Sequence, residues 1–124
     1  MNTNPKLINP AVLFVLTIIL GMWLTSFGKP YHNLLFSAHK LVSVAAVIVT
    51  WLVVRRLIQQ VNVTSTAFVL IAIAALAVLA LFITGALLSI EVSSYQLLKT
   101  IHVVATILSV LSVPAVIYYL LKLK

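Results

Sequence analysis

Four long runs of apolar residues occupy most of the chain, and they constrain its fold more than any other feature. They cover Ala11–Phe27, Leu34–Ile58, Thr66–Ile90 and Tyr95–Leu121. A helix needs about 20 predominantly apolar residues to cross the hydrocarbon core of a bilayer. The runs lack the polar and apolar alternation that is typical of membrane β-barrel strands. The sequence therefore predicts an all-α transmembrane four-helix bundle with up-down-up-down topology, in a single integral membrane domain of residues 1–124.

The composition agrees with a protein whose solvent is lipid. Of the 124 residues, 64% are hydrophobic and only 7% are charged, whereas soluble domains carry about 25% charged residues. The chain has no cysteine and one acidic residue, Glu91, which excludes disulfides, thiolate nucleophiles and paired catalytic carboxylates. The net charge of +7 does not indicate nucleic acid, because the basic residues lie at the ends of apolar runs and form no stripe between aromatic residues.

The distribution of basic residues predicts the orientation of the spans. One side of the membrane receives Lys6, Arg55, Arg56, Lys122 and Lys124, and the other receives Lys29, Lys40 and Lys99. The side with more Lys and Arg is usually cytoplasmic, so we expect both termini in the cytoplasm. The first span lacks a basic leader and an A-x-A cleavage site, and we expect it to be retained. The short connections and the lack of a transit peptide favour a prokaryotic cytoplasmic (inner) membrane.

Polar residues before the apolar runs mark the expected helix starts. The candidates are Asn9-Pro10, Asn33, Ser65 and Ser93 or Ser94. Asn and Ser favour the cap position, and Pro fits the first helical turn. Pro114 predicts a kink in the far half of the fourth helix.

The two halves of the chain resemble each other, which predicts two repeated helix pairs. Leu34–Ser43 aligns without a gap on Leu97–Thr106, with the shared pattern Leu-Leu-x-Ser/Thr-x-His. Upstream, Gly21 precedes His39 by eighteen positions and Gly85 precedes His102 by seventeen. Each glycine is followed at the same offset by a Leu-Thr or Leu-Ser pair, Leu24-Thr25 and Leu88-Ser89.

The repeat predicts a site at two histidines. His39 and His102 each lie five residues after their Leu-Leu start, or about 7–8 Å along the helix at 1.5 Å per residue. The second and fourth helices of the expected topology run in the same direction. We therefore expect the two imidazoles at one depth, near the outer face, with a shared ligand between them. An ionisable residue inside a span is by default a candidate functional residue.

Two histidines suit haem better than a bare metal ion. Zinc takes four ligands, or three and a water molecule, and this sequence offers too few. Haem needs only two axial nitrogens from the protein, because the porphyrin provides the other four. The lack of cysteine excludes the C-x-x-C-H attachment of haem c. The sequence thus predicts one haem b whose iron is bound by His39 and His102, a coordination that favours electron transfer over oxygen chemistry.

Neighbouring residues complete the expected cofactor site. Lys99 lies one turn before His102, and Lys40 follows His39, so both lysines suit haem propionates or lipid headgroups equally well. Gly21 and Gly85 provide room for a flat ring, or a close contact between helices. Ser43 and Thr106 lie one turn deeper than the histidines, on the same faces. Candidate acceptors for the imidazole N–H that faces away from iron are Thr25, Thr84 and Ser89.

The two histidine motifs, Ser37-Ala38-His39-Lys40-Leu41 and Lys99-Thr100-Ile101-His102-Val103, support a family resemblance when taken with the four-span layout. The chain resembles the cytochrome b superfamily, and in particular the small cytochrome b-561 type and the b-type subunits that anchor bacterial dehydrogenases. The resemblance implies electron transfer to or from quinone, a redox protein or a larger membrane complex. These families commonly stack two haems on four histidines. Here the cytoplasmic half has no histidine, which implies one haem near the outer, periplasmic face.

Two other functions remain open from the sequence. A small four-helix transporter matches the size, but such proteins use an acidic residue within a span, and Glu91 lies at a span end. An assembly subunit without haem would use its histidines only for packing. The sequence also leaves open the roles of His32 and Glu91 and whether two copies form a homodimer.

Overall fold

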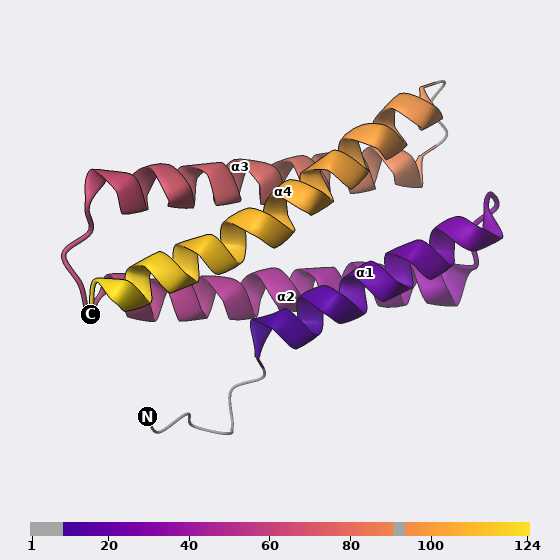
Figure 1. Cartoon of the computed structure of the whole chain (residues 1–124). Helices are drawn as coiled ribbons and strands as arrows, with labels where there is room; N and C mark the ends of the chain where they lie inside the picture. Colours follow the sequence, from indigo (N-terminus) through magenta and orange to yellow (C-terminus); the bar gives the residue numbers. More distant parts are fainter. Residues whose placement is uncertain (1–8, 91–93) are drawn as a thin grey trace. The chain divides into compact units, whose positions relative to one another are not determined.

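The computed structural model describes residues 9–90 and 94–124, which form four α-helices (Figure 1). They are α1 (Pro10–Phe27), α2 (Asn33–Ile58), α3 (Ser65–Ser89) and α4 (Tyr95–Lys122). Each helix is long and apolar enough to cross a membrane. The prediction of an all-α fold with four spanning helices is confirmed, and each helix end lies within one residue of its expected position. Lys6, Glu91 and Ser93, which the sequence analysis assigned to loops or helix ends, lie outside the described residues.

Contacts divide the chain into two compact units, Met1–Val53 and Val54–Lys124. The first unit contains α1 and most of α2, joined by a short turn into an antiparallel hairpin (Figure 1). The second contains the last turn of α2, followed by the antiparallel hairpin of α3 and α4. We call these the first and second hairpins. They correspond to the two helix pairs of the sequence repeat.

Polar caps begin two of the helices. The Asn9 side chain accepts a hydrogen bond of 3.0 Å from the Ala11 N–H, and Pro10 takes the first helical position. At α3 the cap is Thr64, whose hydroxyl accepts from the Ala67 N–H at 3.2 Å, so Ser65 is the first residue inside the helix. Ser94 occupies the cap position of α4, but its side chain makes no capping hydrogen bond to a described residue.

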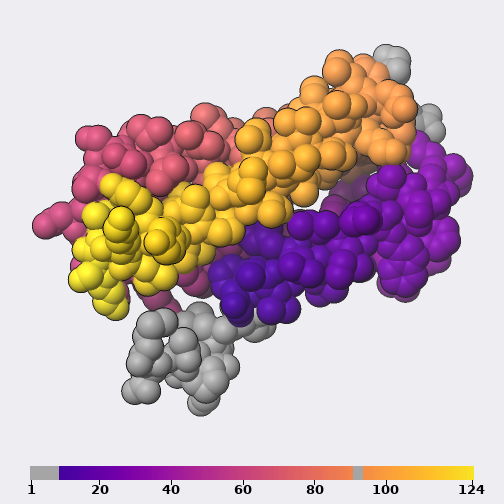
Figure 2. Space-filling model, in the orientation of Figure 1, coloured from indigo at the N-terminus to yellow at the C-terminus, as the bar shows by residue number. Residues whose placement is uncertain are grey.

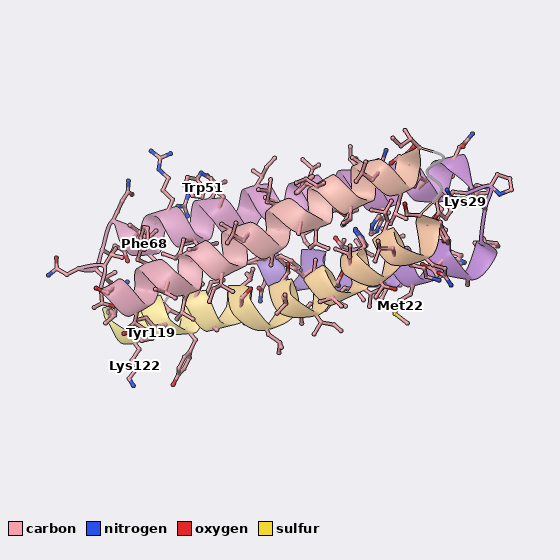
Figure 3. All side chains as sticks on the ribbon, turned by 90° about the horizontal axis from the view of Figure 1, so that it is seen from above. Met22, Lys29, Trp51, Phe68, Tyr119 and Lys122 are labelled. Atoms are coloured by element: carbon pink, nitrogen blue, oxygen red, sulfur yellow. The ribbon has the colours of Figure 1, made fainter. Side chains whose placement is uncertain are left out.

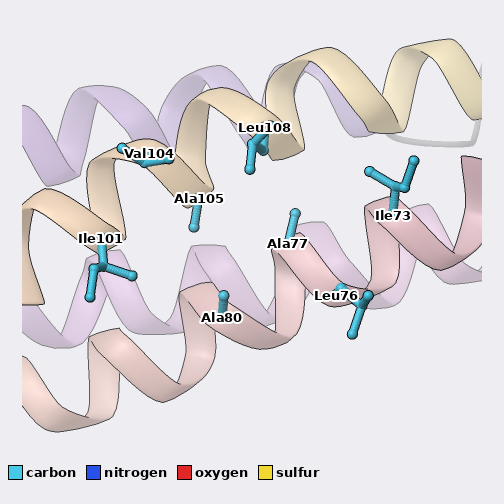
Figure 4. Close-up of a pocket in the computed structure, with 8 residues that line it drawn as sticks. All are labelled: Ile73, Leu76, Ala77, Ala80, Ile101, Val104, Ala105 and Leu108. Carbon is cyan, nitrogen blue, oxygen red and sulfur yellow. The ribbon is translucent and has the colours of Figure 1, made fainter.

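Small side chains let the two helices of the second hairpin approach closely. The buried residues of α3 are Ala67, Ala74, Ala77 and Thr84. Ala77 and Ala105 point toward one another between α3 and α4 (Figure 4). Membrane helices commonly pack through such small residues, because lipid provides no hydrophobic force between them and van der Waals contact must hold them. The space-filling view shows the side chains of α3 and α4 side by side (Figure 2).

The described ends of the hairpins hold polar and aromatic residues. In the second hairpin, Phe68, Tyr119 and Lys122 lie at the same end (Figure 3). There the Thr64 and Tyr119 hydroxyls form a hydrogen bond of 3.3 Å, which joins the start of α3 to the end of α4. In the first hairpin, Lys29 lies in the turn between α1 and α2. Between the ends, many large apolar side chains are exposed, which fits a surface in contact with lipid.

Candidate functional site

His39 bridges the two helices of the first hairpin. Its ring, on α2, is half-buried, and its Nδ1 lies 3.0 Å from the Thr17 carbonyl oxygen on α1. A carbonyl oxygen can only accept a hydrogen bond. His39 therefore donates through Nδ1–H, and the neutral ring carries its lone pair on Nε2.

Gly21 makes the Thr17 carbonyl oxygen accessible to the His39 ring. In a helix the Thr17 carbonyl points toward residue 21, four positions later. Because Gly21 has no side chain, the imidazole can lie directly against this stretch of α1. A Cβ atom built at Gly21 would lie only 3.0 Å from His39 Cε1 and 3.4 Å from its Nδ1. The flat ring that Gly21 accommodates is thus the imidazole itself.

His102 makes the corresponding contact in the second hairpin. Its Nδ1 lies 2.8 Å from the hydroxyl oxygen of Thr84 on α3, and Thr84 is only 5% exposed. The Thr84 hydroxyl has one hydrogen, which it can donate to the Ala80 carbonyl at 2.7 Å. When it does so, its oxygen accepts a hydrogen bond from the Nδ1–H of His102. That tautomer of His102, like that of His39, has its lone pair on Nε2.

The two hairpins share further hydrogen bonds at matching positions. One turn after each glycine, a hydroxyl donates to the glycine carbonyl, from Thr25 at 2.9 Å and from Ser89 at 2.8 Å. One turn after each histidine, a hydroxyl donates to the histidine carbonyl, from Ser43 at 2.6 Å and from Thr106 at 2.8 Å. These repeated contacts show that the aligned residues play the same local structural roles in both hairpins.

The three residues expected to accept from the imidazole N–H have different hydrogen-bond partners in the structure. Thr84 is confirmed as the hydrogen-bond partner of His102. Thr25 and Ser89 donate to carbonyls of their own helices, and the acceptor for His39 is the Thr17 backbone. Sequence reasoning missed Thr17 because every residue type has a carbonyl. The available signal was its position one turn before Gly21, where the missing side chain uncovers the backbone.

The predicted lysines lie close to the histidines along their helices. Lys40 Nζ is 4.2 Å from the centre of the Phe36 ring, one turn earlier on α2. The Phe36 ring stacks on Tyr31 with centroids 5.6 Å apart, and Lys29 Nζ lies 5.9 Å from the Tyr31 ring. Two lysines and two aromatic rings thus gather at the turn of the first hairpin. On α4, Lys99 is half-buried one turn before His102.

The chemistry of these sites is that of imidazoles oriented through a hydrogen bond at Nδ1. An Nδ1–H bonded to a carbonyl or hydroxyl is the usual arrangement behind a metal-bound histidine, because it orients the ring and raises the basicity of the other nitrogen. In residues 9–90 and 94–124, no three His, Cys, Asp or Glu side chains come together as a metal site. His32, exposed beside the turn of the first hairpin, lies outside both histidine contacts. The pairing of His39 with His102 across one ligand remains a prediction.

An open apolar groove of about 310 Å³ runs along the second hairpin between α3 and α4 (Figure 4). It is lined by Ile73, Leu76, Ala77, Ala80, Ile101, Val104, Ala105 and Leu108. Ile101 and Ala105 flank His102 along α4, and the lining includes no polar side chain.

Comparisons with known proteins show no match of the chain to a protein-family model, a curated protein or a solved structure.

Proposed function

We propose that this chain is a membrane-embedded b-type cytochrome that binds one haem between His39 and His102 and transfers electrons. The observation that best supports the proposal is the hydrogen bond at each Nδ1. Each ring is held by a hydrogen bond from its Nδ1 to the preceding helix, and donation through Nδ1 leaves Nε2 as the basic nitrogen. A haem iron requires two such nitrogens from the protein.

The donor set of the chain fits haem better than a free metal ion. Two imidazoles cannot complete the ligand shell of zinc, but they complete that of a haem iron. Bound haem would supply a one-electron iron couple with no open coordination position. The protein's residues orient the two rings, and Lys40 and Lys99 lie near enough along their helices to neutralise propionate groups.

The distribution of charge supports a location near the outer membrane face. The two histidines lie six and seven residues into their helices, or about 9 and 10 Å along the axis. The positive-inside rule assigns the N-terminal ends of α2 and α4 to the outside. An electron would then enter or leave near the periplasmic surface, with quinone or a redox protein as its partner.

Absorption spectroscopy of the purified protein tests this function. Protein made with haem supplied is expected to show a Soret band and, on reduction, the sharp α-band of six-coordinate low-spin haem. His39→Ala and His102→Ala should each abolish or alter these bands. His32→Ala serves as the matched control and should keep them, since His32 is exposed in the turn. A colourless parent protein that is folded and helical would contradict the proposal.

The same hydrogen bonds also favour a second function, that of a haem-free subunit of a larger membrane complex. His39 and His102 each link two helices, and interhelical hydrogen bonds of this kind stabilise membrane bundles by about 1 kcal/mol. In that case the two alanine variants would lose thermal stability, and neither they nor the parent would bind haem.

A further inference from the structure

Three buried hydroxyls differ from most serine and threonine side chains of the helices. Within the part of the chain that the structure describes, the hydroxyls of Thr50, Ser109 and Ser112 are buried and have no hydrogen-bond partner. Other helix hydroxyls donate to a backbone carbonyl one turn earlier, as in Thr17, Thr25, Ser43, Thr84, Ser89, Thr100 and Thr106. A buried hydroxyl without a partner is costly. The three exceptions are therefore candidates for binding a small polar molecule.

Two of these hydroxyls lie together on α4. Ser109 is 1% exposed and Ser112 is 8% exposed. Residues three apart in a helix are neighbours on one face, so the two hydroxyls lie about one turn apart. Ser109 follows His102 by seven residues, close to two full turns, and thus continues the face of α4 that carries the histidine, about 10 Å further along.

We propose that Ser109 and Ser112 bind water inside the membrane-spanning part of α4. Each hydroxyl offers one donor and two acceptor lone pairs. A buried water typically makes about three hydrogen bonds to polar groups that the protein leaves unsatisfied. Water matches these hydroxyls because it can both donate and accept a hydrogen bond. The adjacent Val113 and Val116 side chains are buried and apolar, so they offer no polar partner of their own.

The first hairpin contains a counterpart on its own histidine helix. Thr50 follows His39 by eleven residues, close to three full turns, and so lies on the same face of α2. Its hydroxyl is also buried and has no hydrogen-bond partner among residues 9–90 and 94–124. A polar atom thus recurs deeper than the histidine in each hairpin, and bound water there would place exchangeable protons along the histidine face.

Nuclear magnetic resonance of the parent protein in micelles tests the site directly. Magnetisation transfer from water to the backbone amides of Ser109, Ser112 and Val113 is expected, and it should be lost in the variant that combines Ser109→Ala with Ser112→Ala. An absence of transfer at these amides in the parent overturns the proposal. The measurement on the parent depends neither on the folding of the variant nor on haem, so it stays separate from the test of the cytochrome function.

Thermal unfolding of the same variants gives an independent reading. If the serines hold water, the double variant should unfold at a lower temperature than the parent, because two bonded hydroxyls are lost. If the hydroxyls have no partner, their removal should raise the midpoint or leave it unchanged, and either result overturns the proposal. Ser89→Ala is the matched control, since its exposed hydroxyl donates to the Gly85 carbonyl.

Discussion

At the scale of single residues, the two glycines of the repeat provide different amounts of space. A Cβ at Gly21 would lie 3.0 Å from His39 Cε1, a tighter contact than most real side chains make, whereas a Cβ at Gly85 would lie 3.5 Å from His102 Cε1, an ordinary contact. The difference follows from the acceptors. His39 reaches a backbone carbonyl and must lie against α1, while His102 reaches the longer Thr84 side chain.

We expect Gly21→Ala and Gly85→Ala to have opposite effects. At Gly21 the new methyl group must displace the imidazole, and overpacking of this kind costs about 1–3 kcal/mol. At Gly85 the methyl group fits, and replacing glycine by alanine inside a helix favours folding by up to about 1 kcal/mol. Thermal unfolding in detergent compares the two variants directly. Equal losses of stability in both would contradict the geometry described here.

The acceptors of the histidines allow a second matched comparison. Thr84→Val removes the hydroxyl that forms a hydrogen bond with His102 Nδ1, and the loss of this bond should cost about 1 kcal/mol. Thr84→Ser keeps the hydroxyl and should retain most of the stability. Thr17→Val should leave the His39 contact intact, because that contact uses the Thr17 backbone. Unfolding midpoints, with imidazole ¹⁵N shifts for the tautomers, check these outcomes.

The reverse ranking, in which Thr17→Val disturbs His39 more than Thr84→Val disturbs His102, would show that the acceptors are assigned wrongly.

At the scale of helices, apolar length and polar ends determine where each element starts and stops. The four spans end where charged, glycine or turn residues begin, and their bounds were predictable for this reason. Caps were less predictable, because adjacent Thr64 and Ser65 are both good capping residues. The structure selects Thr64, whose hydroxyl accepts from Ala67 N–H and also reaches Tyr119 of α4.

Thr64→Ala should destabilise the second hairpin by about 1 kcal/mol, the usual cost of losing a side-chain cap. Thr64→Ser keeps the hydroxyl and should behave like the parent. Ser65→Ala, at the next position, is the control for a general effect of substitution at the start of α3. Unfolding by denaturant in micelles measures all three. A loss from Ser65→Ala as large as that from Thr64→Ala would indicate that the cap is placed wrongly.

At the scale of the whole molecule, the pattern of charge predicts the orientation in the membrane. We expect the α2–α3 connection and the C-terminus on the cytoplasmic side and the α1–α2 turn outside. The chain has no cysteine, so single substitutions Gln59→Cys, Lys124→Cys and Lys29→Cys provide clean reporters. In intact cells a membrane-impermeant maleimide should label only Lys29→Cys. Labelling of the other two alone would reverse the orientation.

The sequence by itself determined the all-α class, the four spans, their bounds and the repeated Gly and His positions. These follow from apolar length and from spacing along one chain, which are local properties. Only the tertiary structure decided that each imidazole bonds to the preceding helix through Nδ1, that Thr17 and Thr84 are the partners, and that Ser109 and Ser112 are buried without a partner among the described residues. These depend on which atoms of a neighbouring helix come within hydrogen-bond distance, and a difference of less than one ångström in helix approach changes the outcome.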